Sequence, residues 1–239
     1  MAHPGGHLSI TALIGVPEVS PGDNLAGIVA GIAPRFERGD IVVVSSKVVS
    51  KAEGREVRDR DRADVVADET VEVVAQRGEL TIARTRHGLV LAAAGVDSSN
   101  VASGSLLPLP LDPDESARRI RAGLQTTRDV TLGVVISDTA GRPWRVGQTD
   151  IAIGVAGVTP VVDHSGTLDR HGNLLHVTAP AVADEIAAAA ELVMPKAGGT
   201  PFALVRGLGH LVTDDDGPGA VAIVRPVAED LFRHGSFDE

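Results

Sequence analysis

The chain has 239 residues, which is enough for one large domain or two small lobes with a hydrophobic core that needs no covalent support. It contains no cysteine, and this excludes disulfide bonds, thiolate metal ligands and thioester catalysis. The formal net charge of -10 argues against broad binding to nucleic acid. Because no apolar run approaches the roughly 20 residues that cross a bilayer, and the first residues lack the pattern of a signal peptide, we expect a cytoplasmic protein that does not enter a membrane.

The first third of the chain is predicted to alternate between strands and a helix. Residues 8–19 contain a probable strand, and residues 20–34 have the apolar spacing of a helix, for which Asp23 is a plausible N-cap. Residues 41–44 form an apolar strand that leads into a polar, lysine-bearing segment. The mixed charges that open residues 55–78 are typical of a solvated surface or a short exposed helix.

The rest of the chain continues this alternation. Residues 87–101 have a small-residue strand pattern, and residues 131–138 are a buried strand. A proline-led start with acidic residues predicts a helix over residues 111–125, and a run of alanines predicts another over residues 178–199. Residues 201–209 form a late strand that opens into a loop rich in Gly and Asp. Strands and helices intermix, so the fold class is α/β.

Four polar clusters each follow one of the apolar strands, at residues 45–51, 95–100, 137–142 and 206–217. In open α/β sheets, ligands bind beyond the carboxyl ends of the strands. We therefore expect that the four clusters could line one site.

Asp97, Asp138 and Thr139 are the candidate metal ligands in these clusters. Taken singly, each aspartate could simply make a turn or cap a helix. Taken together, two carboxylates and a hydroxyl group suit a hard divalent cation such as Mg²⁺ or Mn²⁺, with phosphate oxygens and water completing its coordination.

The basic residues near these carboxylates have two interpretations. Lys47 and Lys51 lie four residues apart and are either solvated lysines or, with Ser46, a group that holds phosphates at the start of a helix. Arg142 and Arg145 are either surface charges or a clamp for a carboxylate or phosphate.

Other nucleotide and metal motifs are missing from the sequence. There is no G-x-x-x-x-G-K-[ST] motif of the P-loop type and no H-E-x-x-H motif of a zinc site. The loop over residues 207–219 could be a plain hairpin, although its glycines also permit a close approach of the backbone to a phosphate.

Six stretches in this order resemble the coenzyme F-420:L-glutamate ligase family, including the N-terminal ligase half of its actinobacterial two-domain form. They are GVPEV (15–19), VVVSSKVVSKAEGR (42–55), AAAGVDSSNV (92–101), LDPDESARRIRAGL (111–124), SDTAGRPWRVGQTDIAIGVAG (137–157) and VADEIAAAAELVMPKA (182–197). The resemblance covers nearly the whole chain. It implies one catalytic domain over residues 1–239, without the C-terminal nitroreductase-like domain of the longer form. It also implies a two-lobed subunit of mixed sheets and helices in an intertwined homodimer.

The resemblance implies a reaction in which GTP activates the terminal lactyl carboxylate of F-420-0 as an acyl phosphate. The α-amine of L-glutamate then attacks to form an amide, and a second glutamate is added through a γ-linkage. The cofactors implied are GTP as co-substrate and Mg²⁺ or Mn²⁺, with a monovalent cation such as K⁺ as a further candidate. Such phosphoryl transfer depends on positioning and charge neutralisation and needs no cysteine nucleophile.

The resemblance also assigns roles to individual residues. Those matched to nucleotide binding are Val16, Pro17, Glu18, Val19, Ser46, Lys47, Lys51, Asn100, Gly207, Gly209 and Gly217. Those matched to metal binding are Asp97, Asp138 and Thr139. We expect Arg142 and Arg145 to face the acidic substrates, which makes Asp97, Asp138, Arg142 and Arg145 the candidate catalytic residues. The stretch HLVTDDDGPG (210–219), which contains Gly217, departs from the family pattern.

Two other functions fit the same residues. One is a metal-dependent phosphohydrolase that uses Asp97 and Asp138 on a different phosphorylated substrate. The other is a non-catalytic protein that binds F-420 or a nucleotide, although such a protein need not keep both carboxylates.

Overall fold

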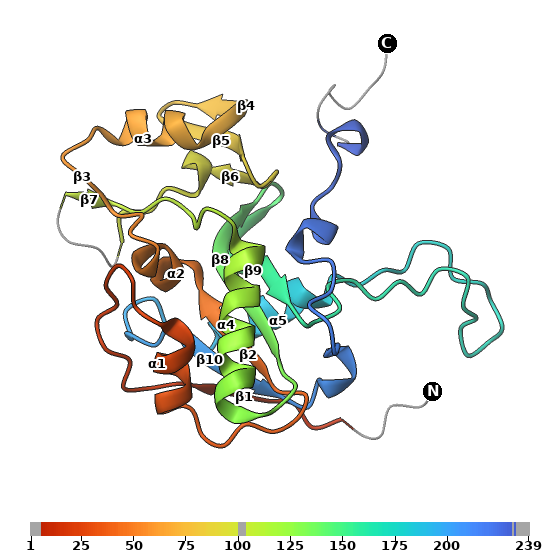
Figure 1. Cartoon of the computed structure of the whole chain (residues 1–239). Helices are drawn as coiled ribbons and strands as arrows, with labels where there is room; N and C mark the ends of the chain where they lie inside the picture. The colour runs from red at the N-terminus through yellow and green to blue at the C-terminus, as the bar shows by residue number, and fades with distance from the viewer. Residues whose placement is uncertain (1–5, 100–103, 231, 233–239) are drawn as a thin grey trace, which may run out of the picture.

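The computed structural model describes residues 6–99, 104–230 and 232, and it consists of a main lobe and a smaller lobe (Figure 1). The main lobe is built on a five-stranded sheet with the order β1-β10-β2-β8-β9. Its strands are β1 (Ser9–Ala12), β2 (Ile41–Ser45), β8 (Gly133–Arg142), β9 (Arg145–Ala156) and β10 (Phe202–Arg206). β2 and β8 run parallel, whereas the other neighbouring strands of this sheet are antiparallel. The α/β fold class is confirmed.

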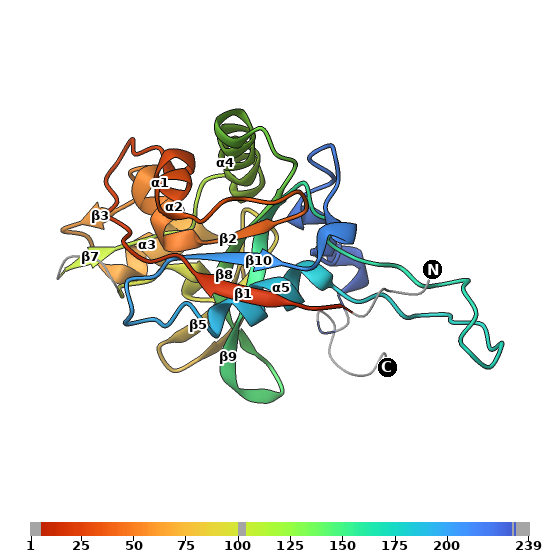
Figure 2. The ribbon, with the colours of Figure 1, turned by 90° about the horizontal axis from the view of Figure 1, so that it is seen from below.

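Helices cover both faces of this sheet, α1 and α4 on one side and α5 on the other (Figure 2). They are α1 (Leu25–Ile32), α4 (Pro113–Arg128) and α5 (Val182–Glu191). In β2, Val42 and Val44 join the core on the side of α1 and α4, while Ile41 and Val43 join the core on the side of α5. Because successive side chains of a strand point to opposite faces, a strand buried on both faces reads as a continuous apolar run.

The helix starts follow from local capping. Asp112 caps α4 by accepting a hydrogen bond from the backbone N–H of Glu115 at 2.9 Å, and Pro113 occupies the first turn. The N-cap of α1 is Asn24, whose side chain accepts from the Gly27 N–H. The prediction that Asp23 caps this helix is therefore wrong, because Asp23 accepts instead from the Ser20 N–H in the preceding turn.

The smaller lobe has a three-stranded sheet, a two-stranded sheet and one helix. Its elements are β3 (Val57–Arg58), α3 (Arg62–Glu69), β4 (Thr70–Arg77), β5 (Leu80–Thr85), β6 (Val90–Ala92) and β7 (Ser105–Leu106). The short exposed helix expected in residues 55–78 is present as α3, but β4 and β5 were not predicted. β4 is mostly exposed, and its apolar residues Val71 and Val73 face solvent.

The remaining helices are short, and a long loop projects from the main lobe. They are α2 (Ser46–Ala52) and the 3-10 helices η1 (Ala93–Gly95), η2 (Gly209–Leu211), η3 (Ala220–Ile223) and η4 (Val227–Glu229). Residues 161–180 extend away from the sheet (Figures 1 and 2), so α5 begins later than the predicted start at residue 178. Within the described part of the chain, no helix is both long enough and apolar enough to span a bilayer.

The buried guanidinium group of Arg121 joins α4 to the loop that follows β10. Its side chain donates to the carbonyl oxygens of Leu132 (2.9 Å) and Thr213 (2.7 Å) and to the carboxylate of Asp216 (2.7 Å). Arg121 is only 3% exposed. Removing it would leave buried carbonyl groups without donors, and such groups are costly to leave unpaired.

We predict that Arg121→Met lowers the free energy of unfolding by about 2–4 kcal/mol, because it breaks a buried charge-assisted network. Urea denaturation followed by circular dichroism measures the change. Arg118→Met is the matched control on the same helix, since Arg118 makes only an exposed ion pair with Glu115 and should cost about 0.5 kcal/mol or less. Equal losses in the two variants would contradict the structural role of Arg121.

Candidate functional site

A cavity of about 390 Å³ opens where the carboxyl end of β2 and the middle of β8 meet the start of α2. Its walls come from four segments that are distant in the sequence: the turn after β1, the β2–α2 junction, the middle of the β8–β9 hairpin and the loop after α5. The lining residues are Val16, Pro17, Glu18, Val19, Ser45, Lys47, Val48, Lys51, Ser137, Asp138, Thr139, Asp150, Met194, Pro195, Lys196, Gly199, Thr200 and Pro201. Its size is within the range of small-molecule sites.

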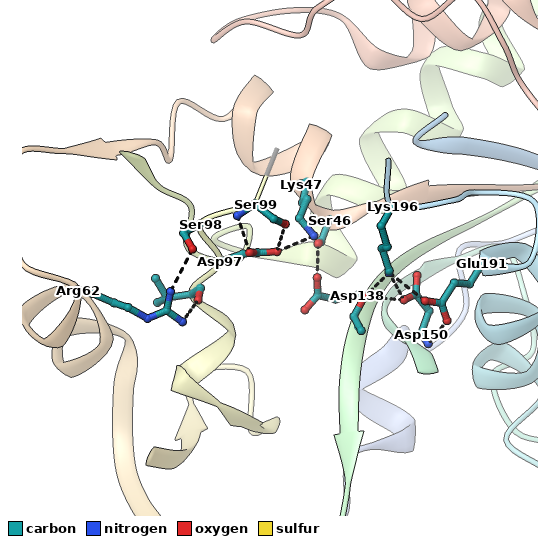
Figure 3. Close-up of polar contacts among 12 residues, drawn as sticks. Ser46, Lys47, Arg62, Asp97, Ser98, Ser99, Asp138, Asp150, Glu191 and Lys196 are labelled. Atoms are coloured by element: carbon teal, nitrogen blue, oxygen red, sulfur yellow. Dashed lines mark hydrogen bonds and ion pairs between the residues drawn. The ribbon is translucent and has the colours of Figure 1, made fainter. Parts of the chain in front are cut away.

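The parallel pairing of β2 with β8 brings two of the predicted clusters together. Ser45 is the register partner of Ser137, so α2 starts beside the point where β8 continues with Asp138 and Thr139. The hydroxyl group of Ser46 donates to the Asp138 carboxylate at 2.5 Å (Figure 3). These two clusters therefore line one cavity, as expected of a shared site.

Asp138 is a carboxylate with too little positive charge around it. Burial raises its pKa to about 6, the hydrogen bond from Ser46 and the charge of Lys47 oppose this rise, and the nearby carboxylates of Asp150 and Asp97 add to it. A carboxyl group in such surroundings is poised to accept a cation, because a cation would supply the missing charge.

Asp97 reaches the same region from the smaller lobe. Its backbone bridges to Leu107, and its carboxylate forms an ion pair with Lys47, with 2.7 Å between Oδ2 and Nζ (Figure 3). Burial by itself would raise the pKa of Asp97, but the hydrogen bond from Lys47 and the donation from the Ser99 N–H hold it below its usual value. Arg62 on α3 supports this loop by donating to the Val96 carbonyl oxygen at 2.9 Å.

The local turn expected of Asp97 is present, while its role as a metal ligand stays a prediction. It makes the local turn, since its Oδ1 accepts from the Ser99 N–H at 2.7 Å, and it also lies beside the lysine that lines the cavity. Lys47 joins it electrostatically to Asp138, so the two predicted carboxylates converge on one region. Asn100, the nucleotide contact implied three residues later, lies outside the described residues.

The turn over residues 16–19, which the resemblance matches to nucleotide binding, also lines the cavity. Within it, Glu18 forms an ion pair with Lys51, with 2.6 Å between Oε1 and Nζ. The side chain of Lys51 is largely buried, whereas that of Glu18 is 82% exposed. A ligand anion could therefore replace Glu18 as the partner of this ammonium group at small cost.

Two further charged residues at the cavity were not predicted from the sequence. Asp150 on β9 is the register partner of Thr139 and accepts hydrogen bonds from Ser137 (3.0 Å) and Thr139 (2.8 Å). Lys196, in the loop after α5, forms an ion pair with Asp150 at 2.9 Å (Figure 3). A lone aspartate at the start of an apolar run in β9 was the available signal for Asp150, while nothing in the local sequence distinguishes Lys196.

Arg142 and Arg145 lie elsewhere. They pair with each other across the exposed tip of the β8–β9 hairpin and are not among the residues that line the cavity. The sequence spacing places them close to Asp138, but β8 continues for four residues beyond it and carries them away along the hairpin. Within one chain the structure does not bring them to the site, so contact with the substrates stays a prediction.

The fourth polar cluster, at residues 206–217, lies at the opposite end of the strands from the cavity. β10 is antiparallel to β2, with Phe202 opposite Val44, so the chain leaves β10 at the end of the sheet remote from the cavity. Gly207 packs there against the backbone of His7, which a Cβ atom would approach to 2.0 Å, and Gly209 packs against Gly39. The expectation that all four clusters line one site is wrong for this cluster, because strand direction reverses its position.

Gly217 follows the same pattern as these two glycines. It lies beside the carbonyl oxygen of Val158 and is not a lining residue of the cavity. The assignment of Gly207, Gly209 and Gly217 to a nucleotide therefore stays a prediction that one chain does not support.

The donor set available to a cation is made of oxygen atoms. Among residues 6–99, 104–230 and 232, no three His, Cys, Asp or Glu side chains form a metal-binding group by themselves. Two carboxylates with the Thr139 hydroxyl fit a hard cation that takes its other ligands from phosphate and water. They do not fit a metal that requires a complete cage of protein ligands.

Comparison with known proteins identifies the family. The sequence profile described as F420-0:Gamma-glutamyl ligase matches residues 13–63 and 57–207. The coenzyme F420:L-glutamate ligase of Methanothermobacter thermautotrophicus is 38% identical, over 95% of this chain and 99% of its own length. The proteins of the same description from Methanopyrus kandleri and Archaeoglobus fulgidus are 40% identical over 90% of this chain and 94% of their length, and 39% identical over 92% and 94%, respectively.

These matches extend through the segments that build the cavity, from the turn at residues 16–19 to the loop after α5. The profile and the relatives agree with each other, and together they cover nearly the whole chain. The chain therefore belongs to the F420-0:gamma-glutamyl ligase family.

Proposed function

We propose that the protein ligates L-glutamate to F-420-0 with GTP as the activating co-substrate. The named activity of its relatives supports the ligation. The use of GTP is supported by one observation: Asp138, Lys47 and Lys51 line the same cavity. Phosphoryl transfer needs carboxylates that bind a cation and ammonium groups that bind phosphate oxygens.

In this proposal, the wall at residues 16–19 holds the guanine nucleotide, while Ser46, Lys47 and Lys51 bind its phosphates. The lactyl carboxylate of F-420-0 attacks the γ-phosphorus, the bond to the β-phosphate oxygen breaks, and GDP leaves. The α-amine of L-glutamate then attacks the acyl phosphate, loses a proton and expels inorganic phosphate. The chain contributes binding and orientation in these steps and no covalent nucleophile.

Asp97, Asp138 and Thr139 would hold the divalent cation. Mg²⁺ or Mn²⁺, when bound, neutralises the negative charge that develops on the phosphate oxygens. The raised pKa of Asp138 supports this assignment, since the burial that causes it leaves a carboxylate short of positive charge. The proposal extends to a monovalent cation such as K⁺ at the same nucleotide.

We also propose a homodimer. The projecting loop over residues 161–180 supports it, because Leu168, Leu174 and Val177 are exposed there, and exposed apolar groups gathered on one segment mark an interaction surface. A partner subunit could also bring its own hairpin tip or Gly-rich loop to this cavity.

The first test follows the product. We predict that the protein, given F-420-0, GTP, L-glutamate and Mn²⁺, forms a product heavier by one or more glutamyl residues, as mass spectrometry would detect. Asp138→Asn should reduce the rate by roughly 100-fold or more, because it removes a cation ligand, while Ser46 can still donate to the new amide and preserve the fold. GDP release without both acceptors would instead favour a phosphohydrolase, and near-normal turnover of the variant would exclude this role for Asp138.

The second test concerns the nucleotide. Lys51→Met should raise the KM for GTP about tenfold or more, the effect of losing one charged hydrogen bond to a phosphate, and leave the KM for L-glutamate unchanged. Steady-state kinetics with each substrate varied in turn measures both values. An unaltered response to GTP would remove Lys51 from the nucleotide site.

The third test uses the pKa of Asp138. Burial raises this pKa from 3.8 to about 6, so the folded protein binds the proton more tightly than the unfolded chain. The resulting stabilisation is present at low pH and is lost as pH rises through about 6. In EDTA, the wild type should lose about 1–2 kcal/mol more of its unfolding free energy between pH 4 and 7 than Asp138→Asn does. Urea denaturation at each pH gives both slopes, and parallel slopes would contradict the prediction.

A further inference from the structure

Thr139, Asp150 and Lys196 line the cavity and form a connected group. Figure 3 shows Lys196 between Asp150 and Glu191. The Thr139 hydroxyl donates to Asp150 Oδ1 at 2.8 Å. The Lys196 ammonium group donates to the same Asp150 oxygen at 2.9 Å, to the Thr139 hydroxyl oxygen, and to Glu191 Oε1 at 3.0 Å. Lys196 comes from an exposed loop, and its side chain is 52% exposed. Packing of the core therefore does not account for its position beside Asp150.

The direction of the hydrogen bond to Asp150 determines what Thr139 can offer a ligand. An ionised carboxylate only accepts, so the single hydroxyl hydrogen of Thr139 must point toward Asp150. The lone pairs of the hydroxyl oxygen are then what remains for any other partner. This is the orientation that a hydroxyl group needs in order to coordinate a cation.

Lys196 takes up a lone pair of this oxygen. Its ammonium group and a divalent cation at Thr139 would compete for the same electrons and would also repel each other. Asp150 is only 5% exposed, and Lys196 supplies the positive charge that offsets its burial. A divalent cation could supply that charge equally well.

We propose that Asp150 and Lys196 control cation binding at Thr139: Asp150 orients the hydroxyl group, and Lys196 covers its oxygen until a divalent cation displaces the ammonium group. This inference rests on the proposed function, which places the cation at Thr139 and Asp138. Asp150 and Lys196 are positioning residues in this scheme, since both act through Thr139.

The proposal predicts effects of opposite sign from the two halves of one ion pair. Removing Lys196 eliminates a competitor, so the cation binds more tightly, whereas removing the charge of Asp150 weakens binding. An ion pair with only a structural role behaves differently, because breaking it from either side perturbs the site in the same direction.

The test is a calorimetric titration of the nucleotide-free protein with Mn²⁺ alone. We expect Lys196→Met and Lys196→Gln to increase the affinity on the order of tenfold, the scale of one unit charge removed from near a divalent cation. Asp150→Asn should decrease the affinity by a similar factor, and Lys196→Arg, which keeps the charge, should stay close to the wild type. Arg118→Met is the control: it removes a positive charge from an exposed ion pair on α4, outside the lining of the cavity, and should leave the Mn²⁺ affinity unchanged.

Circular dichroism and the Tm in EDTA establish that each variant is folded, and the Gln variant serves if the Met variant is not. Unchanged or weaker Mn²⁺ binding in the folded Lys196 variant overturns the inference, and so does unchanged binding in Asp150→Asn. If Asp138→Asn abolishes Mn²⁺ binding while the variants at 150 and 196 have no effect, the inference fails and the proposed cation site stands. If the wild type binds no Mn²⁺ that depends on Asp138, both fail together.

Discussion

The parallel pairing of β2 with β8 is the constraint on which the site depends. It is the one parallel pair among the described strands of this sheet, and it brings the residues that follow Ser45 beside the middle of β8. Ser46 and Lys47 begin a helix there, and Asp138 and Thr139 continue a strand beside them. The segments that we propose to bind phosphate and a cation thus lie side by side without any long loop to join them.

The charged residues around the cavity form ion pairs with one another. In the proposed function, a nucleotide and a cation would separate these pairs. Lys47 is paired with Asp97, Lys51 with Glu18, and Lys196 with Asp150. A protein with a net charge of -10 can therefore keep ammonium groups at the proposed nucleotide site, because each is neutralised locally by an acid. Binding of a metal–nucleotide complex would exchange these partners: phosphates would take the lysines, and the cation would take the carboxylates.

Local sequence was sufficient for α1, α4 and α5 and for the buried strands β2, β8 and β10. The helix predicted over residues 111–125 forms as α4 with Ala117, Ile120 and Leu124 buried, and the apolar run of β2 forms a strand covered on both faces. The strands β4 and β5, which pair with each other, were not predicted. The N-cap of α1 is Asn24 and not the predicted Asp23. Asp and Asn have similar capping strength, so the sequence alone does not distinguish between the two neighbours.

The sequence by itself determined the α/β class, the family motifs, and the residue types that a metal–phosphate site requires. Only the tertiary structure decided which of those residues meet. It joined Asp97 to Asp138 through Lys47, added Asp150 and Lys196, and separated Arg142, Arg145 and the Gly207 loop from the cavity. The physical reason is strand direction and register: a polar cluster after a strand looks the same in sequence whether that strand runs toward the site or away from it.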